Sequence, residues 1–351
     1  MNKVEECLKV IGENEQCRNL VIAALLKAEK ELFKLDFDVR ENVTGPIVDA
    51  MCEGIGTMVK KLSSGITIQF LYRSKIARDF VMSADSIPDH VWEPQTTKLL
   101  LYLAKGAKNV AVAGAYCGDQ AVLMAKTIAS SGGVCHCFEP NPDQITMLKK
   151  NAEINSIQNM KFTQRCVWDK DGERLVLVGD DSFAHPEEAQ AADEGIETIR
   201  FDTYALQNGI EQLNLFMLDI EGAEMAALTG AEKFLAAPAG QAPNLVFEVH
   251  RNYLDWSNGL EQTDIGRMLK KHGYTLFCVR DYQSNEPMHD KPIELIPAHT
   301  AYLEGPPHGF NMLAVKNPDS LIADDKMFKV VPGVSPKLLR HRDPKIHAPI
   351  Y

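Results

Sequence analysis

The sequence predicts an α/β protein in which helices cover both faces of a doubly wound, mostly parallel sheet. From Trp92 onward, short apolar runs typical of buried strands alternate with stretches of helical periodicity. One such run, 109–113, leads directly into Gly114 and then into a helical pattern. The chain of 351 residues, 45% apolar and 24% charged, is long enough for one large core and a smaller domain.

Seven segments have strand character, and the helical patterns between them favour βαβ units. The strand segments are 109–113, 133–138, 160–168, 213–220, 244–250, 274–279 and 310–316. The helices are expected at 92–108, 121–130, 142–155, 223–237 and about 260–272. No helical pattern separates the last two strand segments, so one strand of this pair is expected to run antiparallel.

The regions on either side of this alternation are less regular. Helical spacing predicts one or two helices over 3–33 and another over about 46–62, followed by a short strand within 66–74. An acidic loop over 179–195 is long for a compact domain. We therefore divide the chain into a mainly helical extension (1–90), a central domain (91–317) and a tail (318–351) of unpredicted packing.

Charge and composition narrow the classes of partner. The net charge of −11 argues against a primary role on nucleic acid, which needs a basic surface. No apolar run approaches the roughly 20 residues that span a bilayer, and the first residues lack the apolar core of a secretory signal. The eight cysteines have no zinc-type spacing. A cytoplasmic protein with reduced thiols is expected.

The stretch AVAGAYCGDQ, residues 111–120, forms the expected strand-to-helix turn of a nucleotide-like site. A dinucleotide site needs G-x-G-x-x-G, and this turn has only Gly114 and Gly118. Glu139 follows the next strand, where a carboxylate can accept hydrogen bonds from ribose hydroxyls. The turn and the acid together favour an adenosine ligand, the structural alternative being a tight connection with a capping acid.

Four motifs, VAGAYCG, FEPNP, LDIEGAE and FEVH, together resemble the FkbM family of S-adenosylmethionine-dependent methyltransferases over about residues 92–316. The resemblance implies the Rossmann-like, seven-stranded sheet of class I methyltransferases and S-adenosyl-L-methionine as cofactor. It also implies O-methylation of a hydroxyl on a small molecule such as a sugar or natural product. The absence of an NPPY-type motif argues against methylation of amide or exocyclic amino nitrogens.

The resemblance and the strand ends give the candidate site residues. Those expected to bind the cofactor are Gly114, Ala115, Tyr116, Gly118, Asp119, Glu139, Pro140, Trp168 and Asp219. Those expected to act in catalysis are His250, Asp219 and Glu221. The family usually has an acid two residues before its first glycine and an asparagine in the turn, where this chain has Val112 and Tyr116. Asp119 is the expected substitute for that acid.

His250 ends the fifth strand and is the expected proton acceptor, because a histidine titrates near neutral pH. Asp219 would orient the acceptor hydroxyl or the imidazole. Glu221 and Glu224 have an equally good structural interpretation as acids in a first helical turn. Asp219, Glu221 and His250 could hold a divalent cation, although they lack the spacing of a dedicated metal site, and no metal is predicted.

Two further points remain open in the sequence. Trp92, Glu93 and Pro94 either line the cofactor mouth or fill the core, and the remaining histidines are expected at the surface. The extension over 1–90 would form a lid, a substrate wall or a homodimer contact. The rival to the enzyme is a catalytically degenerate methyltransferase fold that only binds an adenosine ligand, which the departures at Val112 and Tyr116 keep open.

Overall fold

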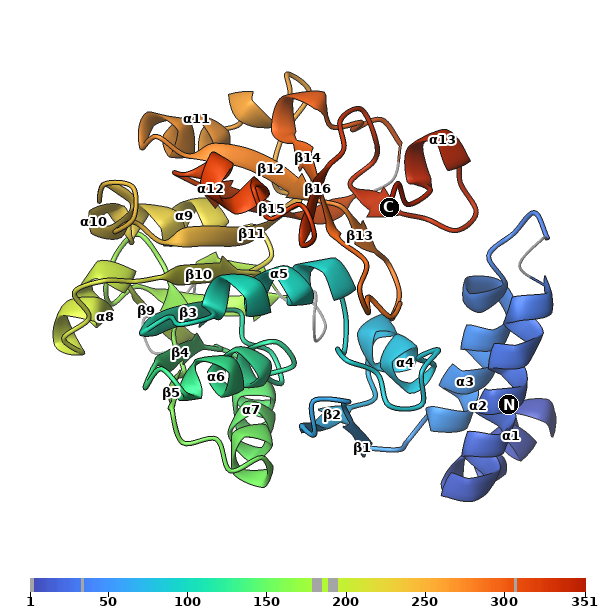
Figure 1. Cartoon of the computed structure of the whole chain (residues 1–351). Coiled ribbons are helices and arrows are strands. Elements are labelled where there is room, and N and C mark those ends of the chain that lie inside the picture. Colours follow the sequence, from blue (N-terminus) through green and yellow to red (C-terminus); the bar gives the residue numbers. More distant parts are fainter. Residues whose placement is uncertain (1–2, 33–34, 179–184, 189–194, 306–307) are drawn as a thin grey trace.

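A nine-stranded mixed sheet forms the centre of the computed structural model, which describes residues 3–32, 35–178, 185–188, 195–305 and 308–351 (Figure 1). The strand order is β16-β14-β12-β15-β11-β10-β3-β4-β5. The strands are β3 (Asn109–Ala113), β4 (Val134–Phe138), β5 (Met160–Thr163), β10 (Leu215–Leu218), β11 (Asn244–His250), β12 (Thr275–Val279), β14 (Ile293–Pro297), β15 (Gly309–Val315) and β16 (Phe328–Val330).

Seven neighbouring strands, from β12 to β5, form the predicted class I methyltransferase sheet. Strands β11, β10, β3, β4 and β5 pair in parallel, and β15 is antiparallel to both β11 and β12. The prediction of one antiparallel strand in the closing pair is therefore confirmed. Strands β14 and β16 extend the sheet beyond β12 and were not predicted, because β14 lies in a stretch broken by prolines and β16 has three residues.

Side chains alternate across the central strands and build one core on each face of the sheet. Val110 and Val112 face the core formed with α5 (Pro94–Ala104), α6 (Ala121–Ala129) and α7 (Pro142–Ile154). Ala111 and Ala113 face the opposite core. That core is formed with α8 (Phe201–Gln207), α9 (Glu224–Thr229), α10 (Glu232–Leu235) and α11 (Asp264–Lys271).

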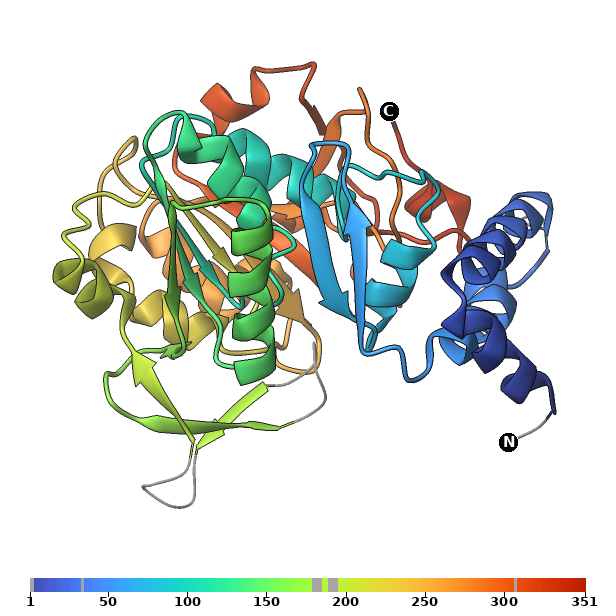
Figure 2. The same ribbon diagram turned by 90° about the horizontal axis from the view of Figure 1, so that it is seen from below.

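The single strand predicted over 160–168 is divided, because the chain leaves the main sheet after Thr163. A four-stranded sheet of order β6-β9-β7-β8 follows, and Figure 2 shows its hairpin extending away from the main sheet. Its strands are β6 (Cys166–Val167), β7 (Arg174–Val178), β8 (His185–Glu188) and β9 (Ile196–Ile199). Of the predicted loop over 179–195, only 185–188 and 195 lie within the described residues.

The first 90 residues are helical at their start and then form a hairpin. The helices are α1 (Lys3–Glu13), α2 (Glu15–Leu32), the π-helix η1 (Arg40–Thr44), α3 (Gly45–Cys52) and, after the hairpin, α4 (Lys75–Val81). The helix predicted over 46–62 is wrong beyond Cys52, because Thr57–Lys61 forms β1 and pairs with β2 (Thr67–Leu71). β1 alternates exposed and half-buried residues, a strand period that its short length conceals.

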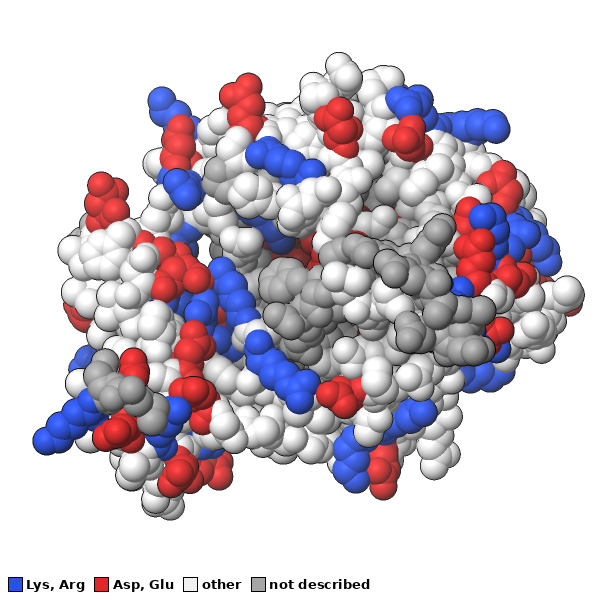
Figure 3. Space-filling view, turned by 180° about the vertical axis from the view of Figure 1, so that it is seen from behind, with Lys and Arg blue, Asp and Glu red and all other residues white. Residues whose placement is uncertain are grey.

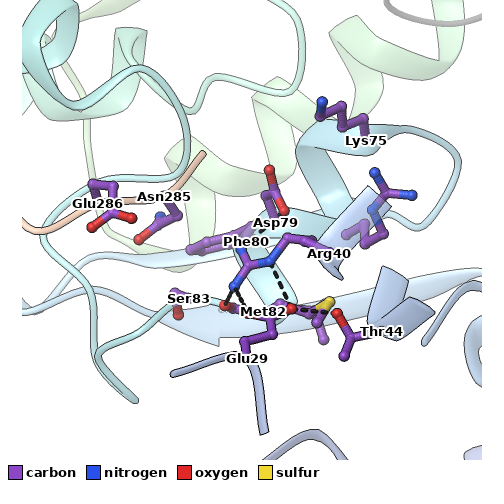
Figure 4. Close-up of polar contacts among 12 residues, drawn as sticks. Glu29, Arg40, Thr44, Lys75, Asp79, Phe80, Met82, Ser83, Asn285 and Glu286 are labelled. Carbon is purple, nitrogen blue, oxygen red and sulfur yellow. Dashed lines mark hydrogen bonds and ion pairs between the residues drawn. The ribbon is translucent and has the colours of Figure 1, made fainter. Parts of the chain in front are cut away.

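A buried arginine joins the N-terminal helices to α4 (Figure 4). Arg40 donates from Nη2 to Glu29 at 2.7 Å and to the Met82 carbonyl at 3.2 Å, and from Nη1 to Asp79 at 3.1 Å. Thr44 adds a hydrogen bond to Glu29. These contacts pair the charge of Arg40 on both sides, which a buried guanidinium requires.

The C-terminal segment packs onto the main sheet instead of forming a separate tail (Figure 1). It contains α12 (Pro318–Ile322), β16, β17 (Lys337–Leu338) and α13 (Pro344–His347), and β17 pairs in parallel with β13 (Asp281–Tyr282). The fully buried Arg280 pairs with Glu294 at 2.6 Å. Its other nitrogens donate to the carbonyls of Ser335 and Ile346, so Arg280 connects two parts of the C-terminal segment to the sheet.

Surface charges of both signs are interspersed over the face seen in Figure 3. Among the helices of the described residues, none has the length and apolar character needed to cross a membrane.

Candidate functional site

A pocket opens at the carboxyl ends of the parallel strands β3, β4, β10 and β11, where open α/β sheets place their ligands. Six of the nine residues predicted to bind a cofactor line it, namely Gly114, Tyr116, Asp119, Glu139, Pro140 and Asp219. The three predicted catalytic residues, Asp219, Glu221 and His250, line the same pocket. The sheet therefore brings together side chains that are up to 136 positions apart in the sequence, from Gly114 to His250.

The turn after β3 requires glycine at position 114. Gly114 has a φ of +77°, and a Cβ there would lie 1.8 Å from the carbonyl oxygen of Asp219. Gly118 has a φ of +89° and packs against Leu148 of α7 instead of lining the pocket. Ala115 is buried beneath the turn. The turn is thus wedged between the ends of β4 and β10, and its backbone forms the pocket wall.

Glu139 is fixed by the backbone of that turn. Its Oε2 accepts a hydrogen bond from the Tyr116 amide at 2.7 Å, and its Oε1 accepts one from the Asn141 amide at 2.9 Å. The residue is only 6% exposed, yet it lines the pocket. These two bonds fix the orientation of the carboxylate at the wall of the pocket.

Trp168, predicted to contact the base of the ligand, does not line the pocket, and its carbonyl packs against Gly230. The wall beyond Glu139 is formed by the residues just before it, Arg165, Cys166 and Val167. The chain turns away toward the four-stranded sheet at this point, which displaces the aromatic side chain from the position that an unbroken strand would give it.

Three carboxylates meet at the ends of β10 and β11. Oxygens of Asp219, Glu221 and Glu248 lie within 4.8 Å of one another. Burial, followed by Glu248 and Glu93, raises the pKa of Asp219 well above its usual range. Burial, followed by Glu221 and Glu93, raises the pKa of Glu248 to about 8. Such a group can share protons, attract a cationic ligand or hold a divalent cation.

Sequence reasoning missed Glu248, although a signal was present. It lies two residues before His250 on β11, and residues two apart on a strand face the same way. Gly309 on the neighbouring β15 makes room for both, because a Cβ there would lie 2.6 Å from His250 Cδ2 and 2.7 Å from Glu248 Oε1.

His250 has a hydrogen bond that limits its chemistry. Its Nδ1 accepts from the Asn252 amide at 3.1 Å, so the neutral ring carries its proton on Nε2. Burial, His308 and Lys337 lower its pKa, which favours that neutral form. In this arrangement His250 can donate a hydrogen bond, whereas the predicted role of proton acceptor would require the Asn252 contact to break.

Glu224 closes the loop after β10 and has the structural role that the sequence left open. Its carboxylate accepts from the amides of Ile220 at 3.0 Å and Gly222 at 3.1 Å, and the residue is 4% exposed. These bonds hold Glu221 in the left-handed region, with a φ of +50°. Glu224 thus supports the position of Glu221.

Segments outside the central strands complete the pocket. Trp92 and Glu93 line it, whereas Pro94 is buried in α5. Lys337 enters from the C-terminal segment, and its Nζ lies 3.3 Å from Glu93 Oε1. Further lining residues come from α4 (Lys75), from the β13 region (Gln283) and from the residue before β15 (His308). No periodic pattern in the sequence indicates that these segments return to the site.

Three of the histidines expected at the surface are buried, namely His90, His136 and His347. His136 lies on β4 between Tyr204 at 3.0 Å and Asn109 at 3.2 Å, and burial lowers its pKa to about 4. The side chain of His185 is outside the described part of the structure.

Comparisons with known proteins find one matching family model and several similar solved structures. The model of the methyltransferase FkbM domain matches residues 113–276. The solved structures that resemble the chain include a methyltransferase FkbM from Methylobacillus flagellatus KT, with 18% identity, a TM-score of 0.27 and coverage of 41% of this chain and 33% of that one. They also include an O-methyltransferase from Bacillus cereus in complex with SAH, with 14% identity, a TM-score of 0.37 and coverage of 65% and 84%. No curated protein matches the chain.

Proposed function

We propose that this chain is a methyltransferase that uses S-adenosyl-L-methionine and methylates a hydroxyl group of a small molecule, because the model of the methyltransferase FkbM domain matches residues 113–276. The observation that carries the proposal is the meeting, in one pocket, of the Gly114 turn with Glu139 and the carboxylates at the ends of β10 and β11. The end formed by the Gly114 turn and Glu139 can bind an adenosine. The end formed by the carboxylates can bind a sulfonium and accept a proton.

At the adenosine end, Glu139 binds the ribose hydroxyls, and the Gly114 turn lets the ligand approach the backbone. Two amide hydrogen bonds hold the Glu139 carboxylate in position at the pocket wall. Cys166 and Val167 provide an apolar wall for the base. The NAD alternative lacks support because a pyrophosphate would have to lie against this same turn, which has no G-x-G-x-x-G.

At the other end, the carboxylate group of Asp219, Glu221 and Glu248 faces the positive sulfonium. The acceptor oxygen attacks the methyl carbon, the bond from carbon to sulfur breaks, and the hydroxyl proton leaves to a base. We assign that base to the carboxylate group and assign His250 to orienting the acceptor oxygen through its Nε2 proton, because Nδ1 is already occupied.

A catalytically degenerate protein that only binds the ligand is the alternative. The lining of the acceptor side favours the enzyme, since a binding module has no need for three carboxylates within 4.8 Å of one another. The two functions differ in whether a reaction takes place. Only the enzyme converts S-adenosylmethionine to S-adenosylhomocysteine together with a methylated acceptor.

The test has a binding arm and a reaction arm. In calorimetry, the wild type should bind S-adenosylhomocysteine, and Glu139→Ala should weaken it by about 1.5–3 kcal/mol, the scale of hydrogen bonds to a charged group. In the reaction arm, mass spectrometry should find one added methyl among hydroxylated metabolites. Incubation with a chelator and with added Mg²⁺ shows whether the carboxylates work with a cation. Tight NAD binding without S-adenosylhomocysteine binding would contradict the proposal.

A further inference from the structure

Glu93 is a pocket carboxylate that neither the strand pattern nor the matched domain includes. It precedes α5 with a φ of +49° and a ψ of +73°, a left-handed conformation that is unfavourable for a residue with a side chain. The residue is 7% exposed and lines the pocket. A strained and buried carboxylate persists only where its surroundings hold it.

Two side chains from distant segments provide that support. Asn311 of β15 donates from Nδ2 to Glu93 Oε2 at 2.6 Å. Lys337 of β17, itself 4% exposed, places Nζ 3.3 Å from Glu93 Oε1. Burial disfavours the Lys337 ammonium, but the carboxylates of Glu93, Asp281 and Glu248 outweigh it and raise its pKa. Lys337 is therefore a fixed cation beside Glu93.

Glu93 lines the same pocket as the turn after β3. Its charge acts on Asp119 in the turn after β3, as well as on Asp219 and Glu248 at the ends of β10 and β11. Glu93, the Gly114 turn and the ends of β10 and β11 line the same pocket. Each of its oxygens has one partner and retains capacity for another donor.

Resting on the proposed function, we propose that Glu93 binds the ammonium group of the amino-acid part of the cofactor and that Lys337 is the residue that positions Glu93. A carboxylate is the natural partner of an ammonium, and Asn311 and Lys337 hold this one in the same pocket as the Gly114 turn. The C-terminal segment is then a working part of the cofactor site.

The role of Lys337 follows from the charges around Glu93. Burial raises the pKa of Glu93, Lys337 opposes this shift, and Asp281 adds to it. Without Lys337, the buried Glu93 carboxylate would take up a proton more readily or turn away. Either change removes the ion pair with the ligand. Arginine keeps the charge and methionine removes it with similar length, so the two substitutions separate charge from packing.

The experiment compares two ligands by calorimetry. S-adenosylhomocysteine carries the ammonium group, and 5′-methylthioadenosine shares the adenosine and sulfur but lacks the amino acid. Glu93→Gln and Lys337→Met should each weaken S-adenosylhomocysteine about 10- to 100-fold, the scale of a charged hydrogen bond. Lys337→Arg should restore most of the affinity. Binding of 5′-methylthioadenosine should stay within about twofold in every variant.

The control is Lys345→Met, an exposed lysine of the same segment, which should bind both ligands as the wild type does. Equal loss of both ligands, or wild-type binding of S-adenosylhomocysteine by Glu93→Gln, overturns the inference. Glu93→Gln keeps the shape of the side chain and decides the matter even where Lys337→Met fails to fold. A wild type that binds neither ligand contradicts the proposed function instead.

Discussion

The two ends of the pocket are built in different ways. The adenosine end comes from consecutive elements, β3, its turn, β4 and the start of β6, within about 60 residues of chain. The opposite end is assembled from α4, the residues before α5, the ends of β10 and β11, and the C-terminal segment. The first end depends on local backbone geometry, and the second depends on long-range buried contacts. Substitutions should therefore affect the two ends by different mechanisms.

The largest effect on stability is expected at Arg280, which connects the C-terminal segment to the main sheet. Arg280→Met leaves Glu294 buried without its partner and frees the carbonyls of Ser335 and Ile346. We expect a loss of about 3–5 kcal/mol in the free energy of unfolding, the cost of breaking a buried ion pair. Urea denaturation measures it. Arg267→Met removes an exposed pair with Asp264 and should cost less than about 1 kcal/mol; equal costs would remove Arg280 from its structural role.

A smaller effect is expected from the local end. Gly114→Ala places a Cβ 1.8 Å from the Asp219 carbonyl in a left-handed conformation, whereas Gly132→Ala has a similar φ and open space around it. We expect Gly114→Ala to destabilise the fold by about 1–3 kcal/mol more than Gly132→Ala, the usual cost of overpacking. It should also weaken S-adenosylhomocysteine, because the turn must move. Thermal unfolding of the two variants should not coincide.

This comparison also explains how much the sequence could predict. The seven strands, the Gly114 turn and Glu139 were predictable because each depends on neighbours in the sequence: an apolar run, a glycine at positive φ and an acid after the next strand. Lys337 was not predictable, since the contact that brings it to Glu93 spans 244 positions and has no period. Trp168 was predicted to contact the cofactor because no pattern in 160–168 indicates that the chain leaves the main sheet after Thr163.

The smallest effect is the dependence of stability on pH through His136, which lies on β4. Burial lowers the pKa of His136 to about 4, below the roughly 6.5 of an unfolded histidine, so the native state favours the neutral ring. The contribution of the neutral His136 ring to the free energy of unfolding is fully present above pH 6.5 and is lost as the pH falls toward 4. At pH 5 the loss should be about 1–2 kcal/mol. The stability of His136→Asn should lack this dependence on pH. If the free energies of unfolding of the variant and the wild type change in parallel between pH 7 and pH 5, His136 is not the cause.

Hydrogen exchange with and without S-adenosylhomocysteine tests most directly the central claim that Glu93 and Lys337 form one cofactor site with the Gly114 turn and Glu139. The account predicts that the ligand slows amide exchange at the Gly114 turn and around Glu139, and also around Glu93 and Lys337. The same measurement with 5′-methylthioadenosine should protect the first two regions and leave the last two unchanged. Protection confined to the N-terminal helices, or no protection by S-adenosylhomocysteine at a saturating concentration, would contradict the account.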